Sequence, residues 1–187
     1  MTSQAAFLGL LGLIALVRLG EVIVSRRRLR ERPEALVAEP GLFPLMVLLH
    51  VGLIGLPAWE VIGLERPFRW PLAVGAGAVL GLATLLRVWT LRTIGRAWNV
   101  RVVVPEEATI VTTGPYRWIR HPNYLVVVLE IASLPLLHGA WISALGLSLL
   151  NAAVLTRRIR TEEAALSELP AWREAMAGKK RLIPGLL

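Results

Sequence analysis

Long apolar runs alternate along this chain with short polar connectors that are rich in arginine. The first three apolar runs cover residues 5–24, 41–63 and 71–91. A helix needs about 20 apolar residues to cross a bilayer, so each run predicts one membrane helix. A fourth run, 124–156, is longer and is broken by Pro135, His138 and Gly139. It predicts two short spans joined by a tight turn, ending near residue 137 and starting again near residue 140.

This pattern predicts the fold class and the domain organisation. We expect an all-α integral membrane protein with about five transmembrane helices, a C-terminal helical hairpin, and a cytosolic loop and tail that carry the site. Residues 1–187 form a single domain, with three spans in 1–91 and the motif loop, hairpin and C-terminal helix in 92–187. Residues 25–40 should be a polar connector. The last helix should run to Leu169 and stop at Pro170.

Basic residues predict how the chain sits in the membrane. Five arginines lie in 25–40, five in 92–122, and seven arginines and lysines follow residue 156, whereas the hairpin tip has none. Cytoplasmic segments carry the excess of positive charge, so the N-terminus should be outside and both long connectors and the tail should be cytoplasmic. Every candidate chemical group then collects on the cytoplasmic side.

Composition narrows the class of function. Hydrophobic residues make up 55% of the chain and the mean hydropathy is +0.60, which is typical of a protein whose partner is the lipid bilayer. The net charge of +8 does not indicate nucleic-acid binding, because the basic residues sit at the ends of apolar runs. Cysteine is absent and the three histidines are far apart, so we expect no metal site.

A few ionisable residues fall inside the apolar runs, where they should face protein or water. Arg18 and Glu21 are three residues apart and so share a helix face, which predicts an inward-facing structural pair. Glu130 should be a buried partner of Arg87 or Arg18, and His50 a packed histidine with its hydrogen bonds satisfied. These groups could also form the relay of a small transporter, but the chain has no inverted repeat to support that.

The chemistry concentrates in the stretch Gly114–Tyr124, which holds two prolines, two arginines, a histidine and three aromatic rings. Its Gly-Pro and Pro-Asn pairs predict a shaped loop that starts a helix near Pro122. On the helix after the hairpin, a second group recurs at three- and four-residue spacing and shares one face: Asn151, Leu155, Arg158 and Glu162. Both groups should face the same compartment. A solvated Arg158–Glu162 pair is the purely structural alternative.

Two motifs in these stretches resemble the isoprenylcysteine carboxyl methyltransferase family. The first is Gly-Pro-Tyr-x-x-x-Arg-His-Pro-x-Tyr at 114–124, and the second is Arg-Ile-x-x-Glu-Glu-x-x-Leu at 158–166, beyond a hydrophobic hairpin. The resemblance covers the last half of the chain. It implies S-adenosyl-L-methionine as the methyl donor, bound on the cytosolic side. The run 123–130 is similar to a bacterial branch that O-methylates phenolic lipids and alkylpyrones, which implies the bacterial inner membrane.

The resemblance also implies roles for individual residues. The cofactor pocket would be shaped by Tyr116, His121, Pro122 and Tyr124, with Glu163 contacting the cofactor. Arg158 would hold the oxygen of the acceptor, with Glu162 and Arg120 as further catalytic candidates, and substrate contacts are expected from Asn99, Arg101 and Asn151. Arginine suits that task because its fork stays charged and can bind an oxyanion through two N–H groups. An acceptor of ordinary phenolic acidity would also need a base, for which His121 and Glu162 are candidates.

The leading hypothesis is a membrane O-methyltransferase that acts on a carboxylate or an acidic hydroxyl of an amphipathic, lipid-like acceptor. A prenyl-cysteine carboxylate and an alkylpyrone or alkylresorcinol hydroxyl both remain open, as does a phospholipid amine methylated on nitrogen. The alternative from another class is a non-catalytic scaffold whose basic loops bind anionic headgroups.

Overall fold

The computed structural model describes residues 2–31, 41–101, 103 and 110–183. Its helices are α1 Ser3–Arg30, α2 Phe43–Gly63, α3 Trp70–Ile94, α4 Pro122–Ser133, α5 Trp141–Leu166 and α6 Pro170–Met176, together with the short 3-10 helices η1 Gly95–Ala97, η3 Gly114–Arg117 and η4 Pro135–His138. Those ranges contain no strand, and Ile119 and Lys180 form an isolated parallel bridge. The predicted all-α class is confirmed.

Four helices are long and apolar enough to cross a membrane: α1, α2, α5, and α3 continued to Ala97. The apolar segment Pro122–His138 is shorter and forms the first half of the predicted hairpin. Gly139 turns the chain with φ +73°, a left-handed conformation that glycine adopts without steric cost, and α5 starts two residues later. The hairpin is therefore present, and the shorter of its two arms is the predicted fourth span.

Two predicted boundaries differ from the structure. The polar connector was expected from Ser25, but α1 continues to Arg30, because arginine and leucine are good helix formers and cations favour a helix C-terminus. The rest of that connector, 32–40, lies outside the described residues. At the other end α5 stops at Leu166, and Pro170 begins α6 instead of ending α5. Proline is well suited to a first helical turn, where its missing N–H is not needed.

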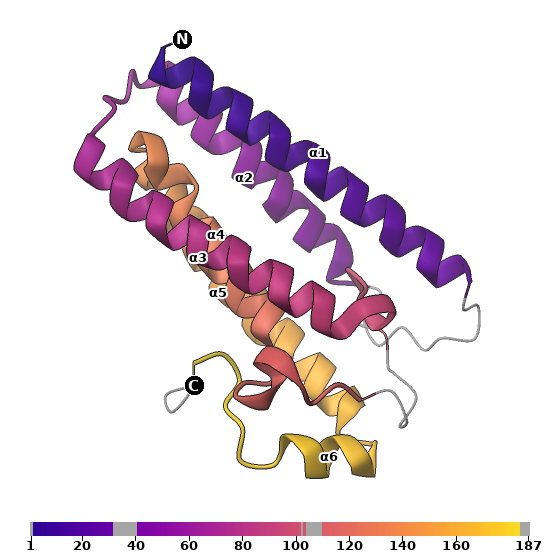
Figure 1. The fold of residues 1–187 in the computed structure, drawn as a ribbon. Helices are drawn as coiled ribbons and strands as arrows, with labels where there is room; N and C mark the ends of the chain where they lie inside the picture. The colour runs from indigo at the N-terminus through magenta and orange to yellow at the C-terminus, as the bar shows by residue number, and fades with distance from the viewer. Residues whose placement is uncertain (1, 32–40, 102, 104–109, 184–187) are drawn as a thin grey trace.

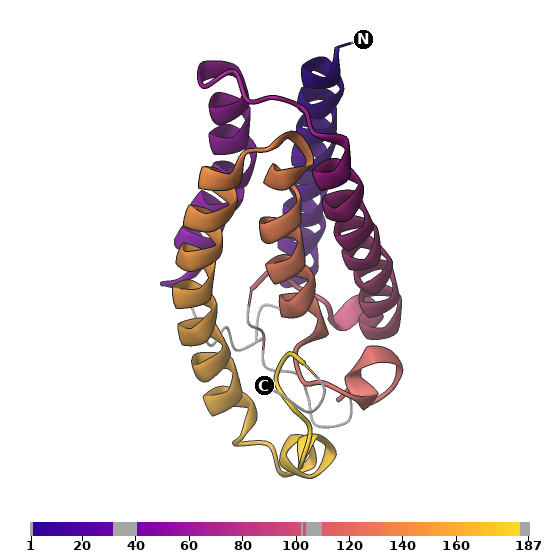
Figure 2. The ribbon, with the colours of Figure 1, turned by 90° about the vertical axis from the view of Figure 1, so that its left-hand side faces the viewer.

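The helices α1 to α5 run roughly along one common direction, with α1 beside α2 and α3 against α4, whereas α6 lies across one end (Figure 1). Turned by 90°, α4 lies between α3 and α5 (Figure 2). The N-terminus and the hairpin turn lie at one end of the bundle. The loop around η3, helix α6 and the C-terminal tail lie at the opposite end. Both predicted motifs therefore gather at one end of the molecule.

A ring of four charged side chains ties α1, α3 and α4 together inside the bundle. Arg18 donates to Glu21 and Glu130, each at 2.7 Å, and Arg87 contacts the same two carboxylates at 2.9 and 3.2 Å. All four side chains are at most 16% exposed. Two arginines balance two glutamates, so the cluster places no net charge among the apolar helices. The predicted inward pair and the predicted role of Glu130 are both confirmed.

Candidate active site

The motif loop is fixed where it meets the end of α3 and the start of α4. Gly114 has φ +57°, and a Cβ atom at this position would collide with the Thr93 side chain, so both backbone conformation and space require glycine. Pro122 is the first residue of α4, and His121 directly precedes it. The predicted loop that starts a helix near Pro122 is confirmed, and it brings the side chains of His121 and Tyr124 to the end of α4.

The C-terminal tail holds this loop through its backbone. Arg120 N–H donates to the Lys180 carbonyl at 2.9 Å, and His121 N–H donates to the Arg181 carbonyl at 3.0 Å. The Lys179 amine also donates to the Tyr116 carbonyl at 2.8 Å. Because these bonds pair the loop with residues 60 or so positions later in the chain, the conformation of the loop depends on tail docking.

The Glu163 carboxylate joins α5, the motif loop and the tail. Arg181 donates to one oxygen through Nε at 2.9 Å and through its terminal nitrogen at 2.7 Å. His121 Nε2 lies 3.1 Å and Arg120 lies 3.3 Å from the other oxygen. Hydrogen bonding to the carboxylate raises the pKa of Arg181 above its ordinary value. Glu163 thus acts as an anchor for the loop in this structure.

The hydroxyl of Tyr124 is a second point, after the Glu163 carboxylate, at which the motif loop is joined to α5. It donates to Glu162 and accepts from Arg158 Nε at 2.8 Å. Arg158 also donates through its terminal nitrogen to the Val100 carbonyl at 2.6 Å, and its guanidinium lies over the Tyr124 ring. The ring of His121 stacks on that of Tyr124 with centroids 5.3 Å apart. Arg158 and Glu162, which were predicted to share one face of α5, therefore both bind the Tyr124 hydroxyl of the motif loop.

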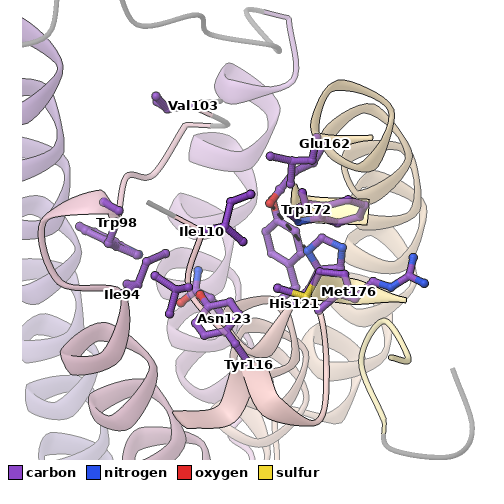
Figure 3. A pocket seen from close by; sticks show the side chains of 15 residues that line it. Ile94, Trp98, Val103, Ile110, Tyr116, His121, Asn123, Glu162, Trp172 and Met176 are labelled. Atoms are coloured by element: carbon purple, nitrogen blue, oxygen red, sulfur yellow. Dashed lines mark hydrogen bonds and ion pairs between the residues drawn. The ribbon is translucent and has the colours of Figure 1, made fainter. Parts of the chain in front are cut away.

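A cavity of about 150 Å³ opens beside this junction (Figure 3). Its wall carries polar groups from the motif loop and from Glu162, and apolar or aromatic side chains from α3, α5 and α6: Ile94, Trp98, Ile110, Tyr116, Arg120, His121, Asn123, Tyr124, Glu162, Leu166, Trp172 and Met176 among others. Burial, and then the charge of Glu162, raises the pKa of the Tyr116 phenol above its ordinary value. Tyr116 is therefore neutral at physiological pH. We call this space the loop cavity.

Three polar atoms in the wall of the loop cavity are buried without a hydrogen-bond partner among the described residues. They are the indole nitrogen of Trp98, the side-chain oxygen of Asn123 and Nε of Arg120. Buried polar groups are normally paired, and each one left unpaired costs about 1–3 kcal/mol. Two donors and one acceptor that belong to cavity-lining residues are therefore left without a partner in the described part of the chain.

A larger cavity of about 670 Å³ also borders Tyr124 and lies between α1, α2 and the start of α4, with Arg158 of α5 in its wall. Most of its wall is apolar, with residues such as Leu19, Ile23, Met46, Val47, Val51 and Ile54. Its polar groups include Arg158 and members of the charged ring. Trp98, Asn123 and Tyr124 line both this helix cavity and the loop cavity. One layer of side chains thus separates a mostly apolar cavity from one whose wall holds a larger share of polar groups.

The remaining predicted residues lie around these cavities. Asn99 accepts from the Ser25 hydroxyl at 2.7 Å and so fastens the connector to α1. The Arg101 guanidinium lies 4.7 Å from the centroid of the Phe43 ring, which lines the helix cavity. Asn151 is buried on the same face of α5 as Arg158, two turns further into the bundle. These three residues support the site from outside its cavity walls in the described part of the chain.

Three residues of the candidate site were not predicted from the sequence. Arg181 was noted only as part of a basic tail, although a basic run close to an acidic pair was a usable signal for an anchor. Trp98 and Asn123 flank the predicted residues, but their unpaired atoms follow from packing and leave no trace in the sequence. The sequence predicted that Glu163 contacts the cofactor. In the structure the carboxylate that lines the loop cavity is that of Glu162, whereas the carboxylate of Glu163 is bound by His121 and Arg181.

The sequence of this chain is similar to one known protein family and to one bacterial protein. The sequence profile of the isoprenylcysteine carboxyl methyltransferase (ICMT) family matches residues 76–168, which include the motif loop, the hairpin and α5. The chain is also 33% identical over 162 residues to the uncharacterized protein YpbQ of Bacillus subtilis (strain 168). That alignment covers 85% of this chain and 95% of YpbQ. The likeness to YpbQ therefore extends beyond residues 76–168 into the N-terminal half of the chain.

Proposed function

Since this chain belongs to the isoprenylcysteine carboxyl methyltransferase family, we propose that it is an S-adenosyl-L-methionine-dependent O-methyltransferase of the membrane. Its acceptor is a lipid-like molecule with a carboxylate or an acidic hydroxyl. The observation that carries this proposal is the pair of cavities with a common wall. A water-soluble donor and a membrane-soluble acceptor must approach one point from two different phases, and two cavities that meet at Tyr124 provide for both.

The loop cavity fits the cofactor. Its unpaired Trp98 and Arg120 nitrogens and Asn123 oxygen suit the hydroxyl and amino groups of a nucleoside and an amino acid. Trp172 and Met176 offer apolar area for a flat base. Bound there, S-adenosyl-L-methionine would supply a methyl group on a positively charged sulfur, an electrophile that Glu162 can face with an anionic side chain.

In this proposal the motif-loop residues Tyr116, His121, Pro122 and Tyr124 shape the cofactor cavity, and Glu163 serves it indirectly. Because the carboxylate of Glu163 binds His121, Arg120 and Arg181, it keeps the loop in a conformation that can receive the cofactor. Preorganised side chains of this kind cost no rearrangement at the moment of reaction.

Arg158 is the residue assigned to the acceptor. It lines the helix cavity, is 5% exposed, and is held by Tyr124 and by the Val100 carbonyl. An arginine fixed in this way presents a permanent positive charge to an acceptor oxygen at the wall shared by both cavities. Holding the oxygen in line with the methyl group lowers the barrier through orientation and through removal of water. Asn99, Arg101 and Asn151 support this side of the site.

The proposal places both cavities toward the cytoplasm, where the cofactor is made, with the apolar helices in the lipid. The scaffold alternative requires no interior cavity next to the motif loop. The nitrogen of a phospholipid amine gains positive charge when it is methylated, so a guanidinium that faces the reacting atom would oppose that transfer. For these reasons an oxygen acceptor is the better match to Arg158.

Calorimetry on purified protein in detergent tests the proposal. We expect S-adenosyl-L-methionine and its demethylated product S-adenosyl-L-homocysteine to bind, and His121→Ala to weaken both. Arg69, exposed at the far end of α3, provides the matched control, since Arg69→Ala removes a charge far from the loop cavity. Absence of binding by the folded wild-type protein would support the scaffold alternative.

A further inference from the structure

His50 on α2 lines the helix cavity, and no step described so far uses it. Its Nδ1 lies 2.7 Å from the Met46 carbonyl oxygen, an atom that can only accept, so Nδ1 carries the proton of the neutral ring. The other ring nitrogen, Nε2, then has a lone pair. No described residue donates a hydrogen bond to it, which makes it available to a hydroxyl group in the cavity.

Resting on the proposed function, we propose that His50 is the general base of the reaction and that the acceptor is a lipid-tailed phenol or enol that arrives as a neutral hydroxyl. A carboxylic acid is already ionised near neutral pH and has no use for a base, whereas a phenol of ordinary acidity keeps its proton. A histidine with a lone pair on the acceptor side of Tyr124 thus favours the hydroxyl class over the carboxylate class.

The charged and titratable groups around His50 do not compete for the hydroxyl proton, because the arginines are already fully protonated and the two carboxylates are held in ion pairs. Those that line the cavity or interact electrostatically with the ring come from four helices: Arg18, Glu21 and Arg26 on α1, Arg87 on α3, Tyr124 and Glu130 on α4, and Arg158 on α5. Glu21 and Glu130 are each bound by two arginines, and Tyr124 already donates its proton to Glu162. Arg158 has no proton to give up at physiological pH.

The two other candidate bases lie on the cofactor side. His121 Nε2 is engaged with Glu163, and Glu162 accepts from Tyr124. Both line the loop cavity, and neither is among the residues that line the helix cavity. An acceptor that enters from the apolar side meets His50 and Arg158 before it reaches these residues.

The hydroxyl proton moves to Nε2 of His50 as the acceptor O–H bond breaks. The oxygen forms its bond to the methyl carbon, and the methyl–sulfur bond of the cofactor breaks with its electron pair kept by sulfur. Arg158 holds the developing negative charge on oxygen, and the proton on His50 is then released to water. The products are the methyl ether, the demethylated cofactor and one proton, so the reaction needs no further reactant.

A matched pair of acceptors tests this assignment. We would compare a para-alkylphenol with the para-alkylbenzoic acid that bears the same alkyl chain, using wild type, His50→Gln and His138→Gln. Glutamine keeps a polar side chain of similar size but cannot take up the proton, so His50→Gln should lower turnover of the phenol by about 10²–10⁴-fold. Turnover of the benzoate should be unchanged. The control is His138, which contacts Ser3 near the N-terminal end of the bundle. His138→Gln should change turnover of neither the phenol nor the benzoate.

The wild-type protein alone provides a second readout. Its kcat/KM for the phenol should rise with pH through one ionisation, and that for the benzoate should not. Because the chain has three histidines, the imidazole nitrogen signals in NMR spectra can be assigned by the two variants. Adding the phenol together with S-adenosyl-L-homocysteine should shift the Nε2 signal of His50, without any turnover.

The outcomes separate the two proposals. Equal losses for both acceptors in His50→Gln, or no loss for either, would overturn the role of His50 as a base. Wild-type protein that methylates the benzoate and not the phenol would overturn the hydroxyl class and leave the methyltransferase proposal standing. Wild-type protein that binds no S-adenosyl-L-homocysteine would refute the proposed function itself.

Discussion

Replacing Arg158 by lysine should depress turnover and leave cofactor binding intact. The native guanidinium donates to Tyr124 through Nε and to the Val100 carbonyl through its terminal nitrogen, at 2.8 and 2.6 Å. These donors are on different nitrogens, and lysine has one nitrogen, so it cannot keep both contacts and also face an acceptor oxygen. The side chain is only 5% exposed, so water has little access to the contacts that are lost.

The size of the effect follows from those contacts. One hydrogen bond to a charged group contributes about 1.5–3 kcal/mol, which corresponds to a loss of about 10- to 150-fold in kcat if it is felt in the transition state. The effect should appear in kcat, because the positive charge that attracts the acceptor is retained.

Turnover and calorimetric cofactor affinity should be measured in the same detergent for Arg158→Lys and for Arg157→Lys. Arg157 is the neighbouring residue on α5 and is exposed, so its change is the matched control. Near-normal turnover by Arg158→Lys would refute the role of the guanidinium fork. A loss of cofactor affinity equal to the loss of turnover would show that Arg158 acts on the loop cavity instead.

Three further predictions concern the loop and the topology. Glu163→Gln should weaken calorimetric S-adenosyl-L-homocysteine binding by about 1.5–3 kcal/mol, because the anchor loses its charge-assisted hydrogen bonds; unchanged affinity would mean that the loop holds its shape without it. Gly114→Ala should lower the free energy of unfolding by about 2–4 kcal/mol, since it combines a left-handed backbone with a collision; an unchanged melting temperature would contradict this reading of the turn. In intact cells an impermeant thiol reagent should label Arg69→Cys and spare Glu168→Cys, both exposed in the structure, and the reverse result would invert the orientation.

Much of the fold could be predicted because a membrane makes hydropathy decisive. The apolar runs located the helices, and Pro135 with Gly139 located the hairpin turn. The inward position of Arg18 and Glu21 followed from the cost of placing charge against lipid. The end of α1 was misplaced because arginine favours helix as well as water, so a polar run does not by itself end a helix.

The candidate site was only partly predictable because its remaining parts depend on contacts between distant segments. Arg181 reaches Glu163 only because the tail pairs with residues 119–121, and no local pattern encodes that docking. The same holds for Asn99, which binds Ser25 from a position 74 residues later in the chain. His50 reads as a packed core residue in the sequence. Its position in a cavity wall appears only when α1, α2 and α4 are assembled.

Transfer of a labelled methyl group tests the central claim most directly. Membranes from cells that express the protein, supplied with S-adenosyl-L-methionine labelled in its methyl group, should yield label in the lipid extract. Membranes from cells that express Arg158→Lys should yield far less, and cells without the protein should yield none above background. Label that is absent from the lipid fraction of wild-type membranes, despite folded protein, would contradict the account of two cavities that meet for methyl transfer.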